Sequence, residues 1–81
     1  MQDSEIKKII ESSFQPYHCG VQFLPVYETH KVSLRLRVSN VDDSLIYEDE
    51  VDLKAVREDL DQLITWWRDD ASKEGFKFAP Q

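Results

Sequence analysis

The strict alternation of apolar and polar residues from Lys31 to Ser39 is the feature that most limits what this chain can fold into. Valine or leucine occupies every second position in this segment, and serine or arginine occupies the positions between. This period of two predicts a β-strand with one buried face and one solvated face. Residues 40–43, Asn-Val-Asp-Asp, have suitable polarity and length for a hairpin turn, so a second, antiparallel strand is expected over residues 44–51.

One register of this hairpin satisfies both faces of the sheet. If Val38 pairs with Leu45, Arg35 lies opposite Glu48 on the polar face, where facing opposite charges contribute a few tenths to ~1 kcal/mol. The same register leaves Asp49 on the apolar face, and this is the weak point of the alignment.

Three further segments complete the expected fold. Isoleucines at helical spacing, Ile6, Ile9 and Ile10, predict a helix over residues 3–13. Residues 18–27 alternate as a strand, and Pro25 places that strand at an edge because proline donates no ladder hydrogen bond. An apolar stripe predicts one long closing helix over residues 53–73, and it is formed by Leu53, Val56, Leu60, Leu63, Ile64, Trp67 and Ala71.

The order of these segments is α-β-β-β-α. We therefore expect an α+β fold in which a three-stranded antiparallel meander carries two helices packed on one face. Eighty-one residues are enough for a single domain spanning 1–81 with one thin core. Residues 76–78 either fold back onto the core or form a short extra strand.

Charge is unevenly distributed along the chain. Residues 1–41 carry four acids and five bases, whereas residues 42–81 carry twelve acids and five bases, and the net charge is −6. One interpretation is that this charge only maintains solubility. The other is that it attracts a basic protein partner, and such binding would weaken at high salt. The acidic residues expected to bind that partner are Asp42, Asp43, Glu58, Asp59, Asp69 and Asp70.

Trp66 supports the binding interpretation. At 100° per residue its azimuth is about 115° from the centre of the apolar stripe, so its ring should be partly exposed between Asp59 and Asp70. A half-exposed tryptophan is a frequent interface anchor. The ring could equally lie flat over the first helix.

Catalytic and metal chemistry have little support in the sequence. Cys19 is the lone cysteine and is expected to be a small core residue rather than a nucleophile. We find no metal-ligand spacing and no glycine-rich phosphate loop, and we expect no cofactor and no enzymatic activity. The N-terminal residues do not form a secretory signal and no long apolar run is present, so we expect a cytoplasmic protein without a membrane span.

Two alternatives to a basic protein partner stay open. The element order matches that of double-stranded RNA-binding domains, but the closing helix begins with only Lys54 and Arg57 before acids follow, so nucleic acid is disfavoured. The uncovered sheet face is expected to present Leu24, Arg35, Arg37 and Glu48, where a small anion or a second copy of the chain could bind as a homodimer.

Residues 10–19 read Ile-Glu-Ser-Ser-Phe-Gln-Pro-Tyr-His-Cys. This segment resembles the opening of a family of short uncharacterised bacterial proteins common in pseudomonads, in which a helix ends in Ile-Glu-Ser-x-Phe and a proline precedes a cysteine-bearing strand. Residues 61–64, Asp-Gln-Leu-Ile, are similar to part of that family's closing helix. The paired Trp66 and Trp67 and the acidic hairpin depart from its pattern. The resemblance implies a bacterial, cytoplasmic setting and carries no assigned activity.

Overall fold

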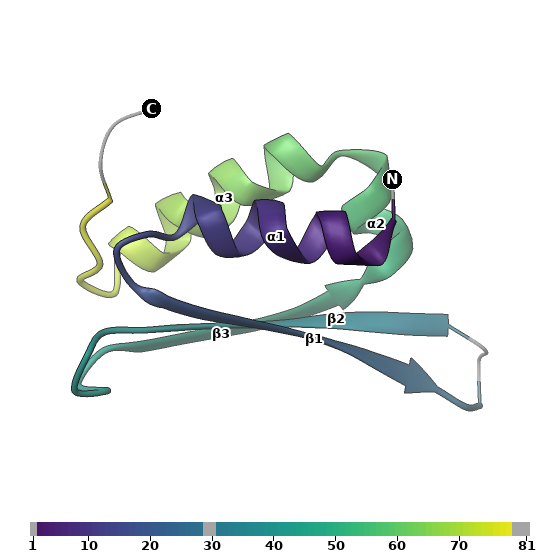
Figure 1. Cartoon of the computed structure of the whole chain (residues 1–81), viewed down its shortest axis with the longest axis horizontal. Coiled ribbons are helices and arrows are strands. Elements are labelled where there is room, and N and C mark those ends of the chain that lie inside the picture. The colour runs from purple at the N-terminus through teal and green to yellow at the C-terminus, as the bar shows by residue number, and fades with distance from the viewer. Residues whose placement is uncertain (1, 29–30, 79–81) are drawn as a thin grey trace.

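The fold is one antiparallel sheet with all of its helices on the same face (Figure 1). The computed structural model describes residues 2–28 and 31–78. Its elements are α1 (Asp3–Ser13), β1 (His18–Val26), β2 (Lys31–Ser39), β3 (Ile46–Asp52), α2 (Leu53–Glu58) and α3 (Leu60–Ser72). The strands lie in the order β1-β2-β3. The expected α+β class and the meander are confirmed.

The alternation in β2 builds the centre of the core. Leu34, Leu36 and Val38 are fully buried, while Arg35 and Arg37 between them are exposed on the other face. Burying each such aliphatic side chain stabilises the fold by roughly 1.5–3 kcal/mol. The helices contribute further buried residues to this core, namely Ile6, Ile10, Phe14, Val56, Ile64, Trp67 and Ala71. Ile9 was expected in the stripe of α1, but it lies at the margin of that helix and is 37% exposed.

The register predicted between β2 and β3 is wrong by two residues. Val38 pairs with Tyr47 rather than with Leu45, and Arg35 lies opposite Glu50 rather than Glu48. The cause is the turn, which spans residues 40–45 instead of 40–43. Asn40 closes it, because its backbone N–H donates to the Leu45 carbonyl (3.2 Å) and its side-chain oxygen accepts from the Leu45 N–H (3.0 Å). A shift of two keeps every side chain on its predicted face.

The single closing helix predicted over residues 53–73 is instead two helices. Asp59 has φ −154° and ψ 72°, which interrupts the helix, and its carboxylate accepts a hydrogen bond from the Gln62 N–H (3.3 Å) at the start of α3. Asp59 and Gln62 have the spacing of an N-terminal capping box, which is the sequence signal for this break. Asp52 caps α2 in the same way through the Lys54 N–H (2.9 Å).

The chain after α3 folds back onto the core. Gly75 adopts φ +113°, a region that favours glycine. Phe76 is buried, and its ring packs edge-on against Tyr17 at 4.8 Å between centroids. Of the two arrangements expected for residues 76–78, the structure shows the return to the core and no strand, while residues 79–81 lie outside the described part of the chain.

A hydrogen bond between Trp67 and Asp49 fastens α3 to β3. The indole of Trp67 is wholly buried and its Nε1–H donates to Asp49 Oδ2 at 2.8 Å. Asp49 is on the helix-covered face, as the sequence predicted, although it lies opposite Leu36 rather than Leu34. The indole gives its carboxylate a hydrogen-bond donor. A hydrogen bond to a charged group contributes ~1.5–3 kcal/mol.

We therefore predict that Asp49→Ala lowers the free energy of unfolding by about 1–3 kcal/mol, because it leaves the buried indole N–H without an acceptor. Glu50→Ala is the matched control, since Glu50 is exposed on the opposite face of the same strand. It should change stability by less than about 0.5 kcal/mol. Urea denaturation followed by circular dichroism measures both variants, and equal losses would contradict this account of Asp49.

Candidate functional site

Two adjacent tryptophans on α3 have opposite environments. Trp67 is wholly buried, whereas Trp66 is 50% exposed. Successive helical residues are 100° apart, so fixing one ring in the core turns its neighbour to the flank of the helix. The partial exposure of Trp66 predicted from the sequence is confirmed.

The flank that carries Trp66 faces away from α1. On the opposite flank, Arg68 Nη1 donates to the Ser13 carbonyl of α1 at 2.7 Å. Asp70 follows Trp66 by one helical turn, and its Oδ2 accepts from the Tyr47 hydroxyl of β3 at 2.8 Å. The Trp66 side of α3 is therefore the side that overlies β3. Figure 1 shows α1 and α3 side by side above the sheet, with β1 in front.

The contact between Tyr47 and Asp70 holds this flank in a fixed position. Burial of Tyr47, then its hydrogen bond to Asp70 and the negative charges nearby, raise the pKa of the Tyr47 hydroxyl well above its usual range. Tyr47 therefore stays protonated and continues to donate to Asp70 throughout the physiological pH range.

Asp59, the N-cap residue of α3, and Asp69, on the helix itself, each already have a hydrogen-bonded or ionic partner. Asp59 caps the helix and lies two turns before Trp66. Asp69 is exposed and forms an ion pair with Lys73 at 3.6 Å. Asp59, Trp66 and Asp70 thus lie along one flank of α3, which we call the Trp66 flank, and Asp69 lies at its outer margin.

The remaining acids of the expected site lie elsewhere. Asp42 and Asp43 are in the β2–β3 turn at one end of the molecule, and Glu58 is at the end of α2, toward the other end (Figure 1). The molecule is 36 Å long, and charges are screened over about 8 Å at physiological salt. The structure therefore brings together the acids around Trp66 but does not join them to Asp42 and Asp43 in one site.

The uncovered sheet face contains a shallow hollow of about 420 Å³ lined by Gly20, Gln22, Arg35, Arg37 and Glu48. The hollow is open at Gly20, where an added side chain would meet nothing within 4 Å. Arg37 pairs with Glu48 at 3.6 Å on this exposed face. Leu24 is on this uncovered face, opposite Ser33, but it is half-buried and does not line the hollow.

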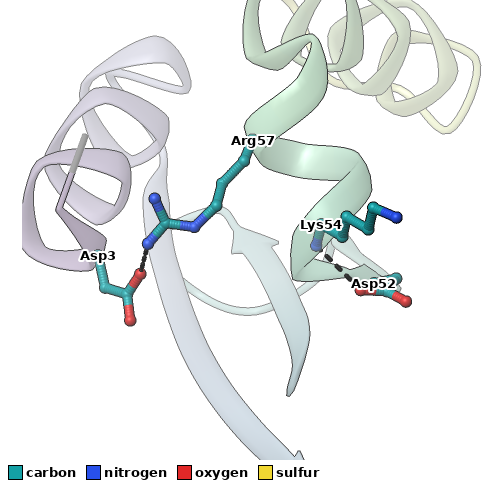
Figure 2. Close-up of polar contacts among 4 residues, drawn as sticks. All are labelled: Asp3, Asp52, Lys54 and Arg57. Atoms are coloured by element: carbon teal, nitrogen blue, oxygen red, sulfur yellow. Dashed lines mark hydrogen bonds and ion pairs between the residues drawn. The ribbon is translucent and has the colours of Figure 1, made fainter. Parts of the chain in front are cut away.

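A small basic groove at the start of α2 was not anticipated from the sequence. It joins Lys31 of β2 to Lys54 and Arg57 of α2. Figure 2 shows that Arg57 reaches across to Asp3 of α1, while Asp52 accepts from the backbone of Lys54. The sequence signal was weak because Lys31 is more than twenty residues away from the other two bases.

Cys19 lies on the core side of β1 and is half-buried. Burial, and to a lesser extent the charge of Glu11, raises the pKa of its thiol to about 12. A nucleophilic cysteine needs the opposite shift. Within the described residues, no three His, Cys, Asp or Glu side chains are placed to hold a metal ion, and no helix combines the length and apolar character needed to cross a membrane.

Comparison of the chain with protein-family models, with curated proteins and with solved structures found no match. The resemblance to a family of short bacterial proteins therefore stays a prediction, and the site has to be interpreted from its own geometry.

The high pKa of Cys19 predicts slow alkylation of the native protein. At pH 8.5 iodoacetamide should modify the native thiol at least about tenfold more slowly than the thiol of the urea-unfolded chain, whose pKa is near 8.5. The native rate should keep rising beyond pH 10 without a plateau. Mass spectrometry gives both rates, and a native thiol as reactive as the unfolded one would contradict this environment.

Proposed function

We propose that this protein is a small non-enzymatic interaction module that binds a basic protein partner through the Trp66 flank. The observation that carries the proposal is a half-exposed tryptophan on a helix that two hydrogen bonds fix to β3, with Asp70 one turn after the ring and Asp59 two turns before it. Such a ring offers a large apolar contact area, and tryptophan is enriched among residues that dominate binding energy. Because the helix is already fixed, binding would not have to order it.

The charges around Trp66 define the chemistry of the partner. Asp59, Asp69 and Asp70 place negative charge on and beside the Trp66 flank, and Lys73 pairs with Asp69 there. A lysine- or arginine-rich surface would be steered toward this flank. Asp42, Asp43 and Glu58 lie outside the Trp66 flank, and in this proposal they add to the negative potential of the molecule without contacting the partner at Trp66.

Two other functions have weaker support. The basic groove favours an anion or a nucleic acid, but Arg57 is already paired with Asp3 and the molecule as a whole carries −6. Self-association through the open sheet face would need a continuous apolar patch. Val26 and Ile46 are exposed there, but the strand register places them at opposite ends of the sheet.

A cytoplasmic and bacterial setting is part of the proposal. It is supported by the single unpaired cysteine and by the resemblance of residues 10–19 to short bacterial proteins.

Affinity capture with matched variants tests the function. The immobilised protein should retain basic proteins from a bacterial lysate at low salt and release them at about 1 M salt, where the Debye length is about 3 Å. Trp66→Ser should lose them. Tyr27→Ser, which removes another exposed aromatic ring (84%) in the turn after β1, should retain them.

Circular dichroism of both variants would show that the fold is kept. Equal capture by the two variants, or no capture by the unaltered protein, would contradict the proposal. Low-salt titration with duplex RNA is the parallel measurement, and micromolar binding there would favour the nucleic-acid alternative instead.

A further inference from the structure

The outer side of β3 is an open sheet edge. β3 pairs with β2 on one side, and among the described residues no strand lies on its other side. Every second residue of such an edge turns its backbone N–H and C=O groups outward, which makes it a template for another strand. β1 is the other edge strand, but it contains Pro25 and Gly20, whereas residues 46–52 contain neither proline nor glycine.

The side chains of β3 separate strictly by face. Glu48 and Glu50 project from the uncovered face, and Tyr47 and Asp49 project beneath α3. On the inner side of β3, the two glutamates face arginines of β2, with Arg37 opposite Glu48 and Arg35 opposite Glu50. β2 is thus an example of a strand that pairs well with β3, because its basic residues alternate with apolar ones. On the outer side, no described strand supplies such bases.

Apolar surface is available on the helix-covered side of the same edge. Trp66 is on the flank of α3 that overlies β3, and its ring is half-exposed. A strand added beside β3 would place every second side chain on this face of the sheet, under the Trp66 flank. Its other side chains would line up with Glu48 and Glu50.

A second copy of this chain does not suit the edge. Antiparallel pairing of β3 with another β3 centred on Asp49 would set Glu48 of each chain opposite Glu50 of the other, and pairing centred on Glu48 would set the two Glu48 residues face to face. Like charges facing each other across two strands are destabilising. The glutamates therefore act against self-pairing and favour a strand of opposite charge.

From these observations we infer that the outer edge of β3 accepts an extended segment of the basic partner, added to the sheet as a fourth strand. The segment alternates lysine or arginine with apolar residues, with its bases opposite Glu48 and Glu50 and its apolar side chains against Trp66. This inference rests on the proposed function and specifies how the partner is held. Main-chain hydrogen bonds supply affinity, and the alternation supplies specificity.

The probe is a synthetic seven-residue peptide that alternates arginine and valine, titrated into the isotope-labelled protein and followed by NMR. We expect the backbone amides of β3 and the Trp66 indole to shift, with a dissociation constant below about 1 mM. Two further peptides carry N-methyl groups on one or the other alternate set of amides. Only one set of amides can face the edge, so one peptide should bind more than about tenfold more weakly and the other nearly as well as the parent.

Charge-matched variants locate the site. Glu48→Gln with Glu50→Gln should weaken binding about fivefold or more, because two facing charge pairs are lost. Asp42→Asn with Asp43→Asn removes the same charge from the turn, where asparagine tolerates the φ of 56° at residue 43. That control should change binding by less than about twofold, since Asp42 and Asp43 lie in the turn before β3 and face no residue of the added strand.

The outcomes separate this inference from the proposed function. If both methylated peptides bind alike, or if the two double variants weaken binding equally, the edge of β3 does not accept a strand. The basic peptide would then be held only by nonspecific attraction to the acidic surface. The parent peptide could also fail to bind while capture of basic proteins still depends on Trp66. That result would overturn the inference about the β3 edge and leave the proposed function standing.

Discussion

The position of the final helix depends on one buried side chain, the indole of Trp67. Its ring fills the space above the sheet, and its Nε1–H bonds to Asp49 of β3 at 2.8 Å. Tyr47 and Asp70 add a second tie between the same two elements. Because these contacts fix the rotation of α3 about its own axis, helical geometry alone determines which of its side chains are exposed to solvent. The half-exposed ring of Trp66 follows from the burial of Trp67, and it needs no separate cause.

The acidic residues of the second half of the chain divide into two groups. Asp49, Asp52, Asp59 and Asp70 accept hydrogen bonds that cap helices or join α3 to the sheet. The other eight are exposed, namely Asp42, Asp43, Glu48, Glu50, Glu58, Asp61, Asp69 and Glu74. Asp59 and Asp70 belong to the Trp66 flank, so contacts that maintain the fold also fix the position of part of its negative charge. The exposed acids that lie near Trp66 and along β3 are the ones that give the proposed surface its preference for bases.

Sequence patterns predicted those features that depend on local periodicity. The alternation from Lys31 to Ser39 gave the buried face of β2, and the azimuth of Trp66 on a helix gave its exposure. Features that depend on particular side-chain hydrogen bonds, or on how distant segments meet, were not predicted. The register of β3 was displaced by two because side-chain hydrogen bonds of Asn40 enlarge the turn.

The helix break at Asp59 was missed because the apolar stripe continues through it, although the capping signal was present. The groove formed by Lys31, Lys54 and Arg57 was missed because it exists only once β2 and α2 are brought together. Within the expected site, Trp66, Asp59 and Asp70 do share one flank. Asp42 and Asp43 are in the hairpin turn, as predicted, but the separation of that turn from Trp66 depends on the tertiary fold.

Exchange of the two tryptophan indole protons with solvent is the most direct test of this arrangement. Each indole N–H gives a separate NMR signal, which Trp66→Phe would assign. We expect the Trp67 proton to exchange about a hundredfold more slowly than that of Trp66, because it is buried and bonded to Asp49 while its neighbour contacts water. Equal exchange rates, or faster exchange at Trp67, would show that α3 is not fixed to β3 and would remove the basis of the proposed surface.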